Sequence, residues 1–353
     1  MISVGKRSSA RVVGLDVQPG YVAAAEVTDE DGLRLRRVGV VDLDAGVVRD
    51  GEVVDVDGLT SALRTLFAEN GLPRRARVGV ANQRVVIRTV DLPPLEGSEL
   101  DAAIRFQASD LIPMPMDQAV LDYHSLGVVD TPDGRRTRVV LVAARREMVM
   151  RLVEALRGAG VRPAGVDVSA FAMVRTMRDT GASEDETVLL VHVGGLTNLS
   201  VARAGVCLFG RALPVGLESM AGALAERRGL TLTHARQWLS YVGLEQPVET
   251  IDGETEIVTE ARRVLAEGTR TIADDVRTSL DYFRLGRPDA SVTSIRLLGP
   301  GCEIPGLAGQ LSAELSLPVQ PAPALDAVAE LSGRGDLARF GLAAGLAVEE
   351  RAA

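Results

Sequence analysis

Residues 11–43 read RVVGLDVQPGYVAAAEVTDEDGLRLRRVGVVDL, and residues 187–215 read TVLLVHVGGLTNLSVARAGVCLFGRALPV. Each stretch has the pattern of three apolar strands joined by two glycine-containing turns. Two such turns that face each other across a cleft would direct backbone N–H groups at a phosphate chain, because tight glycine turns form anion-binding concavities. The repeat therefore predicts an α/β protein with two lobes and a nucleotide-type cleft between them.

Length and composition indicate a folded chain with room for more than one domain. The chain has 353 residues, and its 46% hydrophobic content supplies apolar side chains for more than one core. No window reaches the run of about 18 uncharged apolar residues that a membrane-spanning helix needs. The first residues, MISVGKRSSAR, are basic but are not followed by an apolar stretch, so we do not expect a secretory signal.

Charge and cysteine content argue against several further classes. A formal net charge of -9 disfavours nucleic acid as a partner, because binding to phosphate backbones needs a basic stripe. Aromatic residues make up 3% of the chain and leave few platforms for stacked bases. Cys207 and Cys302 lie far apart in apolar contexts, which predicts buried thiols in a reducing cytoplasm rather than a disulfide or a metal pair.

A distinct module, residues 84–146, separates the two repeats. A helix is predicted to start at Ser98, with Asp101 at capping-box spacing, and to end at the PMP triplet of residues 113–115. Two strands joined by a Pro/Gly turn follow it. The sequence ends in an Ala/Gly-rich helix at 339–350, whose small side chains allow close backbone packing. Further helices are predicted at 59–70, 147–157, 218–228, 234–242, 256–285 and 307–315.

Eight segments, in their order along the chain, resemble the PilM family. They are GLDV (14–17), AAIRFQASDLIPMPMDQAVLDY (102–123), VLVAARREMV (140–149), GVDVSAFAMVR (165–175), ALPVGLESMAGALAERRGL (212–230), VRTSLDYFR (276–284), LLGPGCEIPGL (297–307) and ARFGLAAGLAVEE (338–350). The most specific of them lies in the inserted module. PilM proteins are actin-like cytoplasmic components of the type IV pilus assembly platform and are similar in fold to the cell-division protein FtsA.

The resemblance implies an actin-like ATPase fold, which is an α/β fold of two RNase H-like lobes with an inserted FtsA/PilM-type subdomain. The implied divisions are a first lobe at 11–83, 147–180 and 325–353, an inserted subdomain at 84–146, a second lobe at 185–215 and 256–324, and a small helical subdomain at 216–255.

The resemblance also implies a nucleotide site, but key residues depart from the family pattern. Asp16 stands where an acid would hold Mg²⁺ through water, whereas Gln18 replaces a glycine and Pro19 has no N–H to donate. His192 stands where an aspartate is expected, and an imidazole cannot take the role of that acid beside hydrated Mg²⁺. We therefore expect ATP and Mg²⁺ to bind weakly, if they bind, and hydrolysis to stay near background.

Other positions of the implied nucleotide site are mixed. Arg236 and Leu239 stand where an acidic residue and a lysine would commonly sit near adenine. The residues implied to contact nucleotide are Asp16, Gly20, Gly194, Gly195, Thr197, Gly216, Ser279, Asp281, Gly299 and Gly301. Several have a purely structural alternative, since Asp16 can cap a turn and Gly194 and Gly195 can serve only a hairpin. A histidine such as His192 in an apolar strand is more typical of a core than of a catalytic site.

The partner implied by the resemblance is the short cytoplasmic tail of a PilN-like bitopic membrane protein. The tail would lie in a groove between the first lobe and the inserted subdomain, where backbone pairing and a few side-chain pockets suffice for binding. Ile112, Met114 and Met116 are the candidate contacts, because flexible thioethers suit an irregular peptide, although the methionines can equally fill a core. The resemblance further implies other pilus platform proteins as partners, self-association, and a cytoplasmic location at the inner face of the membrane.

Two other functions stay open at this point. One is an active actin-like ATPase or sugar kinase, which the histidine at position 192 disfavours because phosphoryl transfer depends on placed acids and metal. The other is an FtsA-like filament protein tethered to the membrane, which the C-terminal sequence GLAAGLAVEERAA disfavours because it is poor in aromatic and basic residues. A related secretion or competence apparatus would use similar parts.

Overall fold

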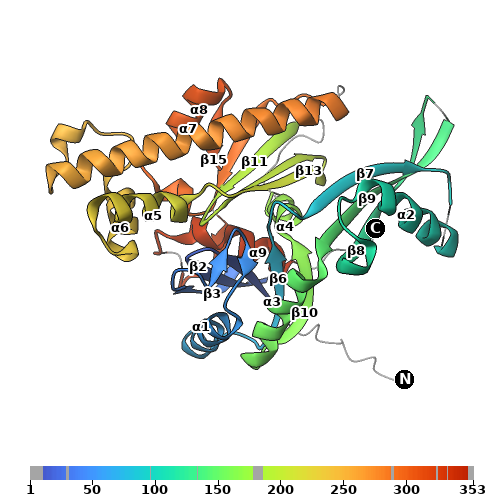
Figure 1. The fold of residues 1–353 in the computed structure, drawn as a ribbon, viewed down its shortest axis with the longest axis horizontal. Helices are drawn as coiled ribbons and strands as arrows, with labels where there is room; N and C mark the ends of the chain where they lie inside the picture. The colour runs from blue at the N-terminus through green and yellow to red at the C-terminus, as the bar shows by residue number, and fades with distance from the viewer. Residues whose placement is uncertain are drawn as a thin grey trace.

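The structure is a computed structural model that describes residues 11–28, 32–95, 97–132, 134–177, 186–287, 290–322, 325–331 and 333–348. Two lobes, each built on one sheet, and an inserted subdomain make up the molecule (Figure 1). The basic N-terminal stretch and the expected lobe boundaries at residues 180, 185 and 353 lie outside the described residues.

The two lobes repeat one strand arrangement, as the sequence predicted. In the first lobe β1, β2 and β3 pair antiparallel and β6 joins β1 in parallel. In the second lobe β11, β12 and β13 pair antiparallel and β14 joins β11 in parallel. The first sheet has the order β10-β6-β1-β2-β3-β16 and the second β13-β12-β11-β14-β15. The strands are β1 (Val13–Gln18), β2 (Tyr21–Thr28), β3 (Arg34–Asp42), β6 (Arg75–Val80), β10 (Arg162–Val168), β16 (Asp326–Ala327), β11 (Thr187–Val193), β12 (Thr197–Arg203), β13 (Val206–Leu213), β14 (Ser294–Leu298) and β15 (Val319–Pro321).

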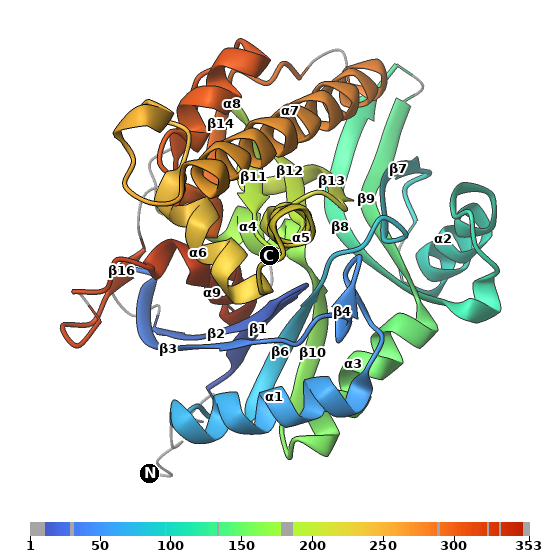
Figure 2. The ribbon, with the colours of Figure 1, turned by 60° about the vertical axis from the view of Figure 1, so that its left-hand side comes forward.

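The helices cover both faces of these sheets (Figure 2). Alternate residues of β2 point to opposite faces, so Val22 and Ala24 join one core cluster with α1 and α3 while Tyr21, Ala23 and Ala25 pack near α9. The first-lobe helices are α1 (Val56–Glu69), α3 (Arg146–Gly158), α4 (Ser169–Arg175) and α9 (Gly341–Ala347). The second-lobe helices are α5 (Leu217–Arg228), α6 (Leu232–Val242), α7 (Thr255–Gly286) and α8 (Leu307–Leu315). Short strands β4 (Val48–Arg49) and β5 (Glu52–Val53) form a separate ribbon.

Helix α9 is buried along its whole length and packs directly on β1. A Cβ atom on Gly14 would lie 1.8 Å from the carbonyl oxygen of Ala343, so only glycine permits this approach. The expected close packing of the Ala/Gly-rich helix is confirmed. The helix itself is shorter than predicted, because residues Leu337–Phe340 form a 3₁₀ turn before it and residues 349 and 350 lie outside the described part of the chain.

The inserted subdomain is a three-stranded sheet of order β7-β9-β8 with α2 against it. Its elements are β7 (Val86–Leu92), α2 (Gly97–Leu111), β8 (Ala119–Thr131) and β9 (Gly134–Arg145). Leu100, Ile104 and Ala108 of α2 form a small core with one face of the sheet. Val140 and Ala144, on the other face, belong to the core of the first lobe. The subdomain is therefore fused to the lobe through shared packing.

Candidate functional site

The two glycine turns that were predicted to face a phosphate chain are packed directly against each other. The backbone N–H of Leu196, in the β11–β12 turn, donates a hydrogen bond of 3.2 Å to Oε1 of Gln18, the last residue of β1. A Cβ atom on Gly195 would lie 2.1 Å from the carbonyl oxygen of Pro19. Contacts this close leave no room for a phosphate group between the turns.

Asp16 and His192 face each other below these turns and are shielded from water. Nε2 of His192 lies 3.9 Å from Oδ2 of Asp16, and the other carboxylate oxygen accepts a 2.7 Å hydrogen bond from Gln18 Nε2. Burial raises the pKa of Asp16 to about 7 and lowers that of His192 to about 4, because each charged form would lose its hydration. His192 also packs on Gly299, where a Cβ would lie 2.6 Å from Nε2.

An ion pair closes the outer side of the cleft. Arg236 on α6 makes a bidentate pair with Glu218 on α5, at 2.9 Å from Nε to Oε2 and 2.8 Å from Nη2 to Oε1. A Cβ on Gly20 would lie 2.4 Å from Glu218 Oε2, so the pair rests on the first turn. The space left beside Gly20, Arg236 and Arg339 is about 100 Å³, which is well below the roughly 300 Å³ of an ordinary small-molecule site.

The remaining residues of the expected nucleotide site fall into two groups. Gly216 packs on Gly195, where a Cβ atom on Gly216 would lie 2.5 Å from the Gly195 carbonyl oxygen, and Gly301 packs on Val193. Gly194 and Thr197 stand in the same buried turn and strand start. Ser279 and Asp281 lie elsewhere, near the C-terminal end of α7, where Arg211 donates a hydrogen bond to Ser279 and Arg284 pairs with Asp281.

ATP and Mg²⁺ do not fit this arrangement of residues. The acid expected to hold Mg²⁺ through water, Asp16, is sealed from solvent and hydrogen-bonded to Gln18. The turns keep their glycines, but the glycines allow the two lobes to touch.

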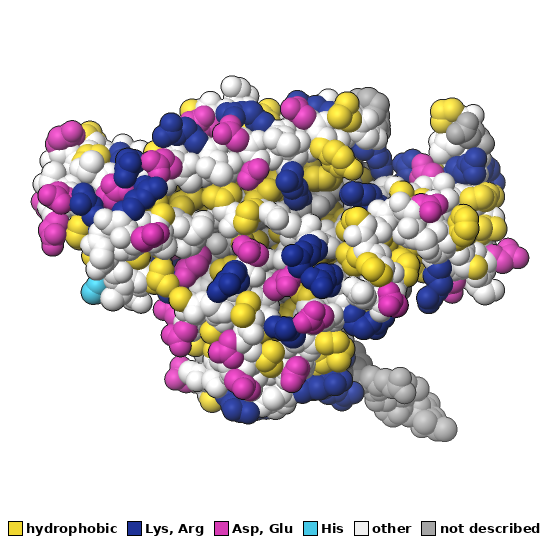
Figure 3. Space-filling model, viewed as in Figure 1, with side chains coloured by type: hydrophobic (Ala, Val, Ile, Leu, Met, Phe, Trp, Pro, Cys, Tyr) yellow, Lys and Arg dark blue, Asp and Glu magenta, His cyan; other side chains and the backbone are white. Residues whose placement is uncertain are grey.

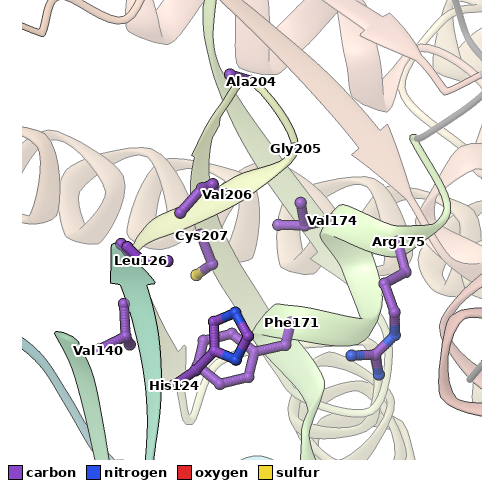
Figure 4. Close-up of a pocket in the computed structure, with 10 residues that line it drawn as sticks. All are labelled: His124, Leu126, Val140, Phe171, Val174, Arg175, Ala204, Gly205, Val206 and Cys207. Carbon is purple, nitrogen blue, oxygen red and sulfur yellow. The ribbon is translucent and has the colours of Figure 1, made fainter. Parts of the chain in front are cut away.

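An open groove lies on another side of the molecule, between the inserted subdomain and both lobes. It consists of two adjoining pockets of about 370 and 310 Å³, and His124 and Phe171 line both of them. Figure 4 shows their side chains in the first pocket, with the β12–β13 turn at Ala204 and Gly205 at the far end of the view. Leu126, Val174, Cys207, Val120, Val149 and Val166 give the walls their apolar character.

The strands beside the groove end their sheets. Among the described strands, β8 is the outer strand of the inserted sheet and β10 is the outer strand of the first-lobe sheet. An edge strand directs alternate N–H and C=O groups away from its partner, so an extended segment can pair with it. Charged groups stand at the second pocket, with Arg77 and Asp167 on the lobe and Asp122 on β8.

The residues that the sequence singled out for partner binding lie away from this groove. Ile112 is 5% exposed in the core of the inserted subdomain, and Met114 and Met116 are half-buried against that core. None of the three lines either pocket. Sequence reasoning missed His124 and Phe171, although Phe171 stands in a segment that carries the family resemblance and His124 directly follows another.

The described helices include none whose length and apolar character would let it span a bilayer.

Comparison with known proteins assigns the family. A family model described as type IV pilus assembly protein PilM matches residues 14–350. A solved PilM-PilN type IV pilus biogenesis complex is 26% identical, with a TM-score of 0.79 over 96% of this chain and 97% of that chain.

Two more distant structures share the fold alone. They are the ethanolamine utilization protein EutJ from Carboxydothermus hydrogenoformans (14% identity, 95% and 88% coverage, TM-score 0.53) and MreB 5 of Spiroplasma citri bound to AMPPNP (10% identity, 96% and 95% coverage, TM-score 0.51). The match of the family model to nearly the whole chain, on an actin-like fold of two lobes and an inserted subdomain, shows that this chain belongs to the PilM family of type IV pilus assembly proteins.

Proposed function

We propose that this chain is a cytoplasmic scaffold of type IV pilus biogenesis that binds the N-terminal tail of a PilN-like bitopic membrane protein. The observation that carries the proposal is the two-pocket groove between the inserted subdomain and the lobes. The solved PilM-PilN complex, similar over 96% of this chain, supports a partner of this kind. Through such a tail the protein would be held at the inner face of the membrane. Other platform partners and self-association stay predictions from the family.

The groove suits an extended peptide with apolar side chains. The free edge of β8 offers backbone groups for pairing, and the two pockets can each take one side chain. Burying an aliphatic side chain contributes roughly 1.5–3 kcal/mol, so two anchored side chains and a few backbone hydrogen bonds account for a useful affinity. The walls are already formed by packed strands and by α4, which lowers the ordering cost of binding.

The scaffold would work without nucleotide turnover. The groove and the closed cleft are separate, because none of the described residues that line the groove stands in the β1–β2 or β11–β12 turn. Another protein of this fold, MreB 5, binds AMPPNP, which favours ATP as a ligand of the fold. In this chain, the contacts of Gly195 with Pro19 and of Glu218 with Gly20 argue against ATP binding.

Fluorescence polarisation with the labelled N-terminal tail of a PilN-like protein from the same organism tests the proposal. Leu126→Glu places a carboxylate on the groove wall and should weaken tail binding at least about tenfold, because a charge in an apolar pocket loses hydration. Val128→Glu, at a more exposed position further along β8, is the matched control and should bind as the unaltered protein does.

ATP with Mg²⁺ should leave the tail affinity unchanged. Equal binding of the tail by Leu126→Glu and by the unaltered protein would place the tail elsewhere. Tail binding that requires ATP would contradict the closed cleft while leaving the groove intact.

A further inference from the structure

One end of the molecule combines arginines with exposed apolar side chains. We call it the basic end, and it comprises Arg88, Arg136, Tyr282, Arg284, Leu285 and Arg287. Leu285 is 86% exposed and Tyr282 is 54% exposed, both on the last turns of α7. In Figure 3, hydrophobic and Lys/Arg side chains lie next to each other below the right-hand end of α7, toward the inserted subdomain.

The residues of the basic end form one surface, although they come from three elements. The guanidinium carbon of Arg88, on β7, lies 5.9 Å from the ring centroid of Tyr282, on α7. Asp91, on the same strand as Arg88, interacts electrostatically with Arg138, Arg136 and Arg287. Hydrogen bonds from Arg138 lower its pKa, and the positive charges of Arg138, Arg287 and Arg136 lower it further.

Among the described residues of this surface, positive charge exceeds negative charge, in contrast to the chain as a whole. Asp91 is matched by Arg138 at 2.6 Å, Asp281 is matched by Arg284 at 3.4 Å, and Asp130 stands opposite Arg135 across the hairpin. Among the described residues, that pairing leaves Arg88, Arg136 and Arg287 as surplus positive charge. The chain as a whole has a formal net charge of -9. The basic end is thus a local exception that selects for an anionic partner.

The exposed side chains of Leu285 and Tyr282 indicate which kind of anionic partner this surface binds. A leucine that is almost fully exposed next to a tyrosine and several arginines matches the composition of surfaces that lie on bilayers. In those surfaces, arginine and lysine bind anionic headgroups, tyrosine sits at the headgroup level and leucine reaches the acyl boundary. A purely acidic protein segment would use the arginines but leave Leu285 in water.

We infer that the basic end is a contact surface for an anionic phospholipid membrane. The inference rests on the proposed function for its orientation. Leu126 of β8 lines the groove, and the same strand continues to Val129, which is paired with Arg136 on β9. A membrane protein's tail that follows β8 toward Val129 would leave the molecule beside the basic end, and the two contacts would act together on one membrane.

Vesicle flotation with the full-length protein and no tail peptide tests the inference. Vesicles of phosphatidylcholine with about 30% phosphatidylglycerol should carry the protein upward at low salt, whereas pure phosphatidylcholine vesicles should not. Arg136→Ser and Arg287→Ser should each weaken binding about fivefold, and roughly 0.5 M NaCl should abolish it. Leu285→Ser should weaken binding to phosphatidylglycerol vesicles at both low and intermediate salt.

Matched variants separate this surface from general effects. Arg270→Ser removes an exposed arginine of α7 outside the basic end, and Val54→Ser removes an exposed apolar side chain of the first lobe. Both should bind vesicles as the unaltered protein does. Absence of binding to phosphatidylglycerol vesicles, or equal binding by the basic-end and control variants, overturns the inference.

The tail-binding assay distinguishes this inference from the proposed function. Arg136→Ser and Arg287→Ser should keep full affinity for the tail peptide in solution, and Leu126→Glu should lose the tail but keep the vesicles. If the arginine variants lose the tail peptide and keep the vesicles, the basic end belongs to the protein partner and the lipid assignment is wrong.

Discussion

His192 Nε2 stands 3.9 Å from Asp16 Oδ2, with the histidine on β11 of one lobe and the aspartate on β1 of the other. Burial favours the neutral form of both groups, whereas in the unfolded chain at about pH 5 both groups are charged. In an unfolded chain at about pH 5 the histidine carries a proton and the aspartate does not. In the folded protein Asp16, with a pKa of about 7, keeps the proton, and His192, with a pKa of about 4, is neutral. Folding thus moves one proton from histidine to aspartate without changing the total.

The first prediction is that this pair contributes little pH dependence to stability until one member is removed. For His192 the folded pKa is depressed, so its contribution is present above about pH 6.5 and is lost as pH falls toward 4. For Asp16 the folded pKa is raised, so its contribution is present below about pH 4 and is lost as pH rises through 7. The two slopes oppose each other between about pH 4 and 6.5.

Single variants expose each slope. Asp16→Asn should lose stability on acidification below pH 6.5, and His192→Asn should lose stability as pH rises toward 7, each by up to about 1.4 kcal/mol per pH unit. Urea unfolding at a series of pH values, with the unaltered protein as reference, measures both. Two variants with the same pH profile as the unaltered protein would show that the pair is hydrated in solution.

The second prediction concerns nucleotide. Because the cavity beside Gly20 is about 100 Å³, ATP with Mg²⁺ should not bind the native state and should not raise the melting temperature. Phosphate release should stay at background and should not change in Asp16→Ala. A melting temperature that rises with ATP concentration would mean that the turns separate in solution.

The third prediction tests lobe contact through a single methyl group. Gly195→Ala places a Cβ 2.1 Å from the carbonyl oxygen of Pro19, so it should destabilise the protein by about 1–3 kcal/mol. Gly222→Ala is the matched control on α5, where nothing lies within 4 Å of the added atom, and it should be neutral or stabilise by about 0.5–1 kcal/mol. Thermal unfolding of both variants decides the matter, since an open cleft would make the two substitutions equally mild.

The fourth prediction separates the core of the inserted subdomain from the groove. Met114→Glu puts a charge against Ile112 and α2, so it should lower the melting temperature by a few degrees, the equivalent of about 1–3 kcal/mol. Tail affinity, measured well below the transition, should be unchanged. The opposite result, a stable protein that no longer binds the tail, would show that Met114 contacts the tail.

Local pattern was enough to predict the strands of the two lobes but not the side chains that line the groove. The strands β1 to β3 and β11 to β13 were predictable because alternating apolar residues and glycine turns are encoded within each stretch. The inserted subdomain looked separable in sequence, whereas Val140 and Ala144 pack into the first lobe, and that contact depends on tertiary structure. His124 and Phe171 meet across the groove only because β8 and α4 are brought together by the fold.

Site chemistry was predictable in part. The departures at Gln18, Pro19 and His192 were visible as residue types, and they indicated a weakened phosphate site. The Arg236–Glu218 pair over Gly20 was not visible, because it depends on how α5 and α6 are placed against the first turn. Ser279 lies near Arg211 and away from that turn for the same reason, since the position along α7 decides its neighbours.

The packing of α9 on β1 delays completion of the first lobe while the chain is being synthesised. Strand β1 is synthesised long before helix α9, yet Gly14 is covered by Ala343, and carbonyls of α9 accept hydrogen bonds from Arg77 and Arg175. The first lobe therefore cannot close its core while the second lobe is still being synthesised, and its sheet face stays exposed for that time. A nascent chain arrested before residue 341 should be bound by chaperones and cut readily by proteases in the first lobe. Once the α9 segment has left the ribosome, chaperone binding and protease sensitivity of the first lobe should both disappear.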